Sequence, residues 1–204
     1  TTARTMARAF ATMMEHGQAD RRIGDELLRD VLEQTPNFIS TWTTWEPNAF
    51  DGRDREYIGN PNSDSTGRYC PTWSRARPPI RLEPPVEYAD DSRNSYYTLP
   101  RLAGHEVIVP PFRWNSLGKV IYETSLVVPI LDRGRFAGLV GVDIDLETIR
   151  HMVLAIRPMG SGYACLLSQE GKYVAHPGAD MTDRPILAAA VRNGFEQAQR
   201  SSVF

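Results

Sequence analysis

The first part of the chain carries two apolar stripes with helical spacing. The first stripe consists of Met6, Phe10, Met13 and Met14, which fall on one face of a helix. Gly17 interrupts this pattern, Asp20 is a favourable N-cap, and a second stripe runs over residues 23–32 until Pro36 ends it. These residues predict two amphipathic helices whose apolar faces pack against the rest of the domain.

From residue 38 the period changes to alternation, which is typical of a β-strand. Phe38, Ser40, Trp42 and Thr44 are expected on one side of this strand, and Ile39, Thr41, Thr43 and Trp45 on the other. Pro47 ends it, because proline cannot continue a central ladder. Residues 51–111 are rich in proline, which predicts a long loop-rich excursion. The tyrosines and tryptophans within it indicate that this excursion is ordered and functional.

Regular structure returns with a predicted β-hairpin. Its strands cover residues 119–130 and 136–144, around a tight turn at residues 132–134. The remaining predicted elements are a helix over 145–158, a second hairpin with strands over 163–167 and 172–175, and a short helix over 186–198. The expected fold class is α/β (α+β), with one antiparallel-sheet module followed by the start of a second.

Composition excludes several classes of protein. The chain has 204 residues, and its 23 Lys and Arg against 25 Asp and Glu leave no basic footprint for nucleic acid. The four histidines and two cysteines have no metal-site spacing, and no nucleophile elbow, phosphate loop or dinucleotide fingerprint occurs. No segment has the roughly 18 consecutive apolar residues that span a bilayer. We therefore expect no enzyme activity, no metal, no cofactor and no nucleic-acid partner.

Two segments, TSLVVPILDRGRFAGLVGVDIDLETIRHMV and GYACLLSQEGKYVAHP, closely resemble the double Cache (dCache) sensor domains of bacterial methyl-accepting chemotaxis proteins. In that family a long N-terminal helix packs along two stacked PAS-like modules, and the membrane-distal module binds a small molecule. The resemblance implies a helical stalk over 1–36, a complete distal ligand-binding module over 37–157 and a partial proximal module over 158–204. It also implies a periplasmic location in an inner-membrane receptor, which is a homodimer with transmembrane helices outside this chain.

Amino-acid-binding members of this family share an arginine that holds the ligand carboxylate, followed by aromatic residues and the aspartate of GVDI, which holds the ammonium. The resemblance places the aromatic and acidic half of this pattern at Tyr96, Tyr97, Phe112 and Asp143. The arginine position falls on Asn94, although Arg93, Arg101 and Arg113 lie near enough in sequence to replace it. The pattern therefore implies a site that keeps its cation-binding half and lacks its carboxylate-binding half.

A buried ammonium is costly unless it meets a carboxylate or the faces of aromatic rings. Each ring face contributes about 0.5 to 2 kcal/mol, so several rings and one carboxylate suffice for micromolar binding. Trp42 and Trp45 are three residues apart on a strand, so at most one of them is expected to line the pocket. The candidate ligand-binding residues are Trp42, Trp45, Glu46, Tyr96, Tyr97, Phe112, Trp114, Glu123 and Asp143.

Each candidate carboxylate also has a structural interpretation. Asp143 could cap the helix that follows, Glu46 could face solvent, and Glu123 could be a solvated charge on an edge strand. The functional interpretation predicts an extracytoplasmic sensor that binds a small amine, quaternary ammonium compound or betaine through an aromatic cage and acidic residues. One alternative is an amino-acid sensor with a displaced arginine. Another is the same module coupled to a histidine kinase or a diguanylate cyclase.

Overall fold

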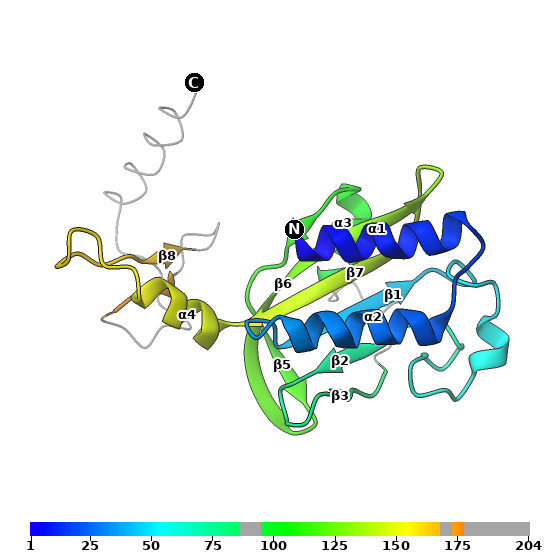
Figure 1. The fold of residues 1–204 in the computed structure, drawn as a ribbon, viewed down its shortest axis with the longest axis horizontal. Helices are drawn as coiled ribbons and strands as arrows, with labels where there is room; N and C mark the ends of the chain where they lie inside the picture. Colours follow the sequence, from blue (N-terminus) through cyan, green and yellow to red (C-terminus); the bar gives the residue numbers. More distant parts are fainter. Residues whose placement is uncertain (86–94, 168–172, 178–204) are drawn as a thin grey trace. The chain divides into compact units, whose positions relative to one another are not determined.

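The computed structural model describes residues 1–85, 95–167 and 173–177. It divides the chain into two units, Thr1–Asp145 and Leu146–Phe204 (Figure 1). The first unit therefore contains both N-terminal helices together with the main sheet. The helix predicted over 186–198 lies outside the described residues.

An antiparallel sheet forms the centre of the first unit. Its strands are β1 (Ser40–Trp45), β2 (Thr72–Ser74), β3 (Arg81–Leu82), β4 (Val107–Ile108), β5 (Phe112–Ser116), β6 (Lys119–Asp132) and β7 (Arg135–Asp145). They are arranged in the order β3-β2-β1-β7-β6-β4, and β5 also pairs with β6. The predicted fold class is confirmed, because helices and a curled antiparallel sheet are the architecture of Cache and PAS-like sensor domains.

The predicted hairpin is the β6–β7 pair. Its turn consists of Arg133 and Gly134, with φ angles of 50° and 80°. Two consecutive residues with positive φ give the type I′ geometry that matches the twist of the flanking strands. Glycine at the second position adopts this conformation without steric cost. The local sequence therefore fixes the turn, and the register of the two longest strands shifts once beyond it, between Ile130 and Leu131.

Helices α1 (Thr2–Glu15) and α2 (Arg21–Gln34) lie over one face of the sheet, as Figure 1 shows. The chain breaks between them at Gly17, whose φ is 64°. The Asp20 carboxylate caps α2 by accepting hydrogen bonds from the backbone N–H groups of Arg22 at 2.8 Å and Ile23 at 3.3 Å. Both predicted helices and the predicted cap are confirmed.

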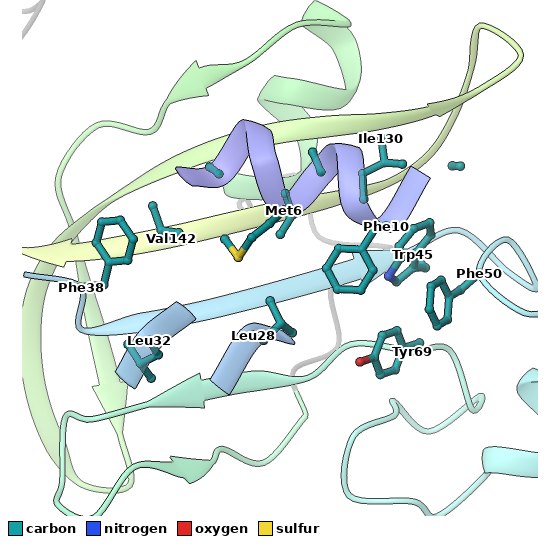
Figure 2. Packing of buried hydrophobic residues seen from close by; sticks show 14 residues of the cluster. Met6, Phe10, Leu28, Leu32, Phe38, Trp45, Phe50, Tyr69, Ile130 and Val142 are labelled. Carbon is teal, nitrogen blue, oxygen red and sulfur yellow. The ribbon is translucent and has the colours of Figure 1, made fainter. Parts of the chain in front are cut away.

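The main hydrophobic core lies between these helices and the sheet (Figure 2). The Phe10 ring makes edge contacts with Trp45 and Phe50, at centroid distances of 5.8 and 5.9 Å. Phe50 in turn stacks on Tyr69 at 4.8 Å. Phe38 also packs in this core, which corrects the prediction that it shares a side with Trp42. The reason is that β1 begins only at Ser40, so the alternation does not extend back to residue 38.

The long excursion is held against α2 by one buried arginine. The Arg21 guanidinium donates to Asp51 at 2.7 Å and to Asp54 at 2.8 Å, and also to the carbonyl of Gly67 at 2.7 Å. A guanidinium suits this role because its fork of donors reaches several acceptors at once. These contacts explain why residues 51–67 pack against the helix.

Five elements inside the excursion were not predicted, namely the strands β2, β3 and β4 and two helices. A short 3-10 helix covers Asp54–Tyr57, and α3 covers Ser95–Ala103. Helix α3 contains Pro100, a residue that usually interrupts a helix, which is why the sequence did not predict it. Helix α3 contacts β6 and β7.

The second unit is described in part. It contains α4 (Leu146–Leu154) and a small antiparallel pair of strands, β8 (Leu166–Leu167) and β9 (Tyr173–Ala175). Helix α4 contacts β9. Each described helix of the chain is too short or too polar to cross a bilayer.

Candidate functional site

Alternating residues from five strands line a pocket on the sheet. In a strand every second side chain points to the same face, so each strand contributes residues two apart. The pocket holds about 600 Å³ of empty space, its open mouth included. Its lining residues are Ser40, Trp42, Thr44, Cys70, Thr72, Ser74, Tyr96, Phe112, Trp114, Ile121, Glu123, Ser125 and Asp143.

The indole of Trp42 lies flat against a glycine. A Cβ atom built on Gly141, its cross-strand partner on β7, would stand only 2.2 Å from the ring atom Cζ2. The missing side chain therefore makes room for the indole, whose Nε1–H donates to Asp143 at 3.0 Å. On the other side Tyr96 meets Trp42 edge-on, with a centroid distance of 5.4 Å. The GVD sequence thus supplies both the space for the ring and the acceptor for its N–H.

Asp143 is buried, with 5% of its surface exposed. Besides Trp42, the hydroxyl of Ser40 donates a hydrogen bond to its second carboxylate oxygen. Burial raises the pKa of Asp143, and the hydrogen bonds from Ser40 and Trp42 oppose that shift. These donors fix the orientation of the carboxylate in the wall of the pocket.

Glu123 is the second buried carboxyl group of the pocket, with 3% of its surface exposed. Burial, together with the negative charges of Asp143, Asp145 and Glu83, raises its pKa to about 9. It therefore carries a proton at neutral pH while the pocket holds no cation. This location corrects the alternative of a solvated edge charge, because β5 and β7 flank β6 at this position.

No basic side chain lines this pocket among the described residues. The nearest arginine candidates face elsewhere: Arg113 is exposed on β5, and Arg101 pairs with Glu46 at 3.5 Å. Asn94 and Arg93 lie outside the described residues. Within residues 1–85, 95–167 and 173–177, no group of three side chains is arranged to bind a metal ion. The described pocket can therefore neutralise a positive charge but offers no basic partner for a ligand carboxylate.

The structure brings together six of the nine predicted residues. Trp42, Tyr96, Phe112, Trp114, Glu123 and Asp143 all line the pocket. Trp45 does not, because it lies on the other face of β1 and packs against Phe10. Glu46 and Tyr97 do not line it either, and their predicted position in the pocket is corrected as well.

Glu46 and Tyr97 instead connect α3 to the sheet. The Tyr97 hydroxyl donates to the Glu46 carboxylate, which also accepts the ion pair from Arg101. The Arg101 guanidinium lies 5.7 Å from the centroid of the Tyr97 ring and 5.6 Å from that of Phe136. Burial and the Glu46 charge raise the pKa of Tyr97, so its hydroxyl stays a donor. This contact fixes the helix that carries Tyr96 into the pocket.

Several lining residues were missed by sequence reasoning. The alternation along β1 already placed Ser40 and Thr44 with Trp42, and that signal could have identified both. The same rule applied to β6 would have grouped Ile121 and Ser125 with Glu123. Cys70, Thr72 and Ser74 had no such signal, because they lie in the loop-rich excursion.

Comparison with known proteins relates the chain to sensor domains. It is 28% identical to the methyl-accepting chemotaxis protein TlpQ of Pseudomonas aeruginosa, over 60% of this chain and 19% of that protein. The extracellular domain of a protein described as histidine kinase mmHK1S-Z3 matches with a TM-score of 0.78 and 29% identity, over 98% of this chain and 70% of that chain. A structure of methyl-accepting chemotaxis protein X matches with a TM-score of 0.75 and 28% identity, over 98% of this chain and 76% of that chain. No family model matches the sequence.

The homologues are therefore ligand-binding sensor domains of chemoreceptors and histidine kinases. The chain spans a fifth or less of the length of the curated relatives that it matches. The names of the three proteins above specify no ligand. The amine branch predicted from the sequence thus stays a prediction.

Proposed function

We propose that this chain is the extracytoplasmic sensor domain of a transmembrane receptor and that its pocket binds a small amine or quaternary ammonium compound. One observation carries the ligand class. Two buried carboxyl groups and four aromatic side chains line the pocket, while none of its described lining residues is basic. A bound cation would supply the positive charge that these described residues lack.

The energetics favour such a ligand. Removing a carboxylate from water is costly unless a charge partner or hydrogen bonds compensate. An ammonium group at Asp143 would supply that partner in a region of low dielectric, where the attraction is strong. Trp42 and Tyr96 would add about 0.5 to 2 kcal/mol for each ring that faces the cation. These two rings contribute about 1 to 4 kcal/mol, so the ammonium–carboxylate pair must supply the larger part of the roughly −8 kcal/mol of a micromolar complex.

Isothermal titration calorimetry of this chain with 1-aminobutane, choline and a panel of α-amino acids tests the ligand class. We expect the two cations without a carboxylate to bind, and Asp143→Asn to abolish that binding. Glu26→Gln is the matched control, because it removes a carboxylate from the exposed face of α2. Binding of α-amino acids alone would overturn the amine proposal and support an arginine at a position such as Arg93.

A ligand signals only if it binds two arrangements of the domain with different affinity. Helix α3 is a suitable element for such a change, because its Tyr96 reaches the pocket while Tyr97 holds the helix to Glu46. By analogy with the relatives, the complete protein is proposed to be a homodimer with a periplasmic sensor. Its cytoplasmic output is proposed to be chemotaxis, with a histidine kinase as the alternative that the mmHK1S-Z3 relative favours.

A further inference from the structure

The two carboxyl groups of the pocket lie at different positions along the sheet. In the β6–β7 register Asp143 stands opposite Ser125, whereas Glu123 stands opposite Asp145. Glu123 is therefore displaced from Asp143 by one strand and by two residues along the strand. Diagonal neighbours of this kind have Cα atoms about 7 to 8 Å apart. The two carboxyl groups therefore belong to separate positions along the wall of the pocket.

Each carboxyl group also has its own aromatic neighbours. Trp42 donates to Asp143 and meets Tyr96 edge-on. Phe112 stands directly opposite Glu123 in the β5–β6 register, and Trp114 follows two residues later on the same face of β5. The pocket thus repeats one arrangement, a carboxyl group beside two rings, at both of its ends.

The carboxyl groups of Asp143 and Glu123 differ in the hydrogen bonds that they accept. Asp143 accepts hydrogen bonds from Ser40 and Trp42. Among the described residues no hydrogen bond to the Glu123 carboxyl group contributes to its pKa, although only 3% of the surface of Glu123 is exposed. A buried carboxylate without donors is unfavourable, and a primary ammonium brings three N–H donors.

The charges around Glu123 are all of one sign. Asp143 and Asp145 on β7 and Glu83 next to β3 act on it, and Glu83 itself accepts a hydrogen bond from Ser116 at 2.6 Å. Strand β5 contributes no opposing charge, because Arg113 is exposed on its other face. A ligand with one positive charge would neutralise only one of the two pocket carboxylates, so the other would have to keep a proton.

From this arrangement we infer that the pocket is built for a linear diamine, with one ammonium group at Asp143 and the other at Glu123. The inference rests on the amine function proposed above and adds a second cation-binding position to it. The methylene chain between the two nitrogens would lie along the strand direction, past Ser125. Glu123 is then the residue that distinguishes diamines from monoamines.

Isothermal titration calorimetry of this chain at pH 7 with 1,4-diaminobutane and 1-aminobutane tests the inference, because the two probes differ only in the second nitrogen. Diamines that are one and two methylenes longer test larger distances between the two nitrogens. We expect a diamine to bind at least about tenfold more tightly than the matched monoamine, since each tenfold step needs only about 1.4 kcal/mol. Glu123→Gln should remove this preference, so that the diamine binds no more tightly than the monoamine in that variant, whereas Glu26→Gln should retain it.

The outcomes separate this inference from the proposed function. If monoamines bind as tightly as every diamine, the second position is refuted and the amine sensor stands. If a diamine is preferred but Glu123→Gln retains the preference, the assignment of Glu123 is wrong. If no amine binds at any length, the amine function fails and the inference fails with it.

Discussion

Glu123→Gln is expected to stabilise the ligand-free protein at alkaline pH. An unfolded chain holds a glutamate with a pKa of about 4.3, whereas the folded pocket raises the pKa of Glu123 to about 9. Below pH 4.3 both states are protonated. Between these two values only the folded state keeps the proton, so unfolding releases it and rising pH favours unfolding. Above a pH of about 9 both states are ionised, and Glu123 lowers the free energy of unfolding no further.

The size of the effect follows from the width of that window. Each pH unit inside it removes about 1.4 kcal/mol from the free energy of unfolding. Between pH 5.5 and 8.5 the wild type should therefore lose up to about 4 kcal/mol relative to Glu123→Gln, which has no proton to release. Asp143→Asn should show a shallower slope than the wild type, because one of the negative charges that raise the pKa of Glu123 is then absent.

Urea denaturation at several pH values, followed by tryptophan fluorescence, measures this difference. All four tryptophans belong to the unit Thr1–Asp145, so the signal reports the domain that contains the pocket. Contributions from titrating groups that do not interact with Glu123 cancel in the difference between the two proteins. Glu26→Gln should follow the wild type. Parallel curves for wild type and Glu123→Gln across this range would show that Glu123 ionises normally, and the argument from burial would then be refuted.

Three further predictions concern binding. Gly141→Ala should displace Trp42 and weaken amine binding by at least tenfold, with a destabilisation of about 1 to 3 kcal/mol from overpacking. Gly138→Ala is the control, because its Cβ would instead meet the core; it should destabilise the protein but leave the dissociation constant unchanged. Equal losses of binding in both variants would contradict the role of Gly141. Tyr97→Phe removes a hydrogen bond to the Glu46 carboxylate, so denaturation should show a destabilisation of about 1.5 to 3 kcal/mol. Calorimetry should show a higher dissociation constant for the amine. If neither value changes, this contact does not position α3. Diamine binding should release protons at pH 7 and tighten as pH rises toward 9, because the raised pKa of Glu123 means that its proton must leave first. Calorimetry in buffers of different ionisation enthalpy measures the number of protons released. Binding heats that do not depend on the buffer would exclude this proton release.

The sequence by itself determined the elements whose causes are local. The stripes of α1 and α2, the Asp20 cap and the alternation of β1 follow from period and capping alone. The β6–β7 hairpin was equally predictable, because Arg133 and Gly134 specify the turn. The resemblance to dCache domains, together with the clustering of aromatic and acidic residues, identified six of the residues that line the pocket.

Tertiary structure decided whether a side chain of the sheet faces the pocket or the helices. Both faces of β1 are buried, so alternation separated Trp42 from Trp45 but could not tell which faces the pocket and which the helices. Glu46 and Tyr97 carry residue types that suit a ligand site, yet their position at the α3 contact depends on packing between segments about 50 residues apart. Long-range contacts of this kind leave no period in the sequence.

The chemistry of the pocket is likewise a product of pairing between strands. The raised pKa of Glu123 exists because β6 and β7 bring Asp143 and Asp145 beside it and because the sheet removes it from water. The role of Gly141 exists because the register places it under the Trp42 indole. The sequence contained these residues and their types, but their charges and contacts became defined only once the strands had paired, since desolvation and Coulomb interactions depend on distances in space.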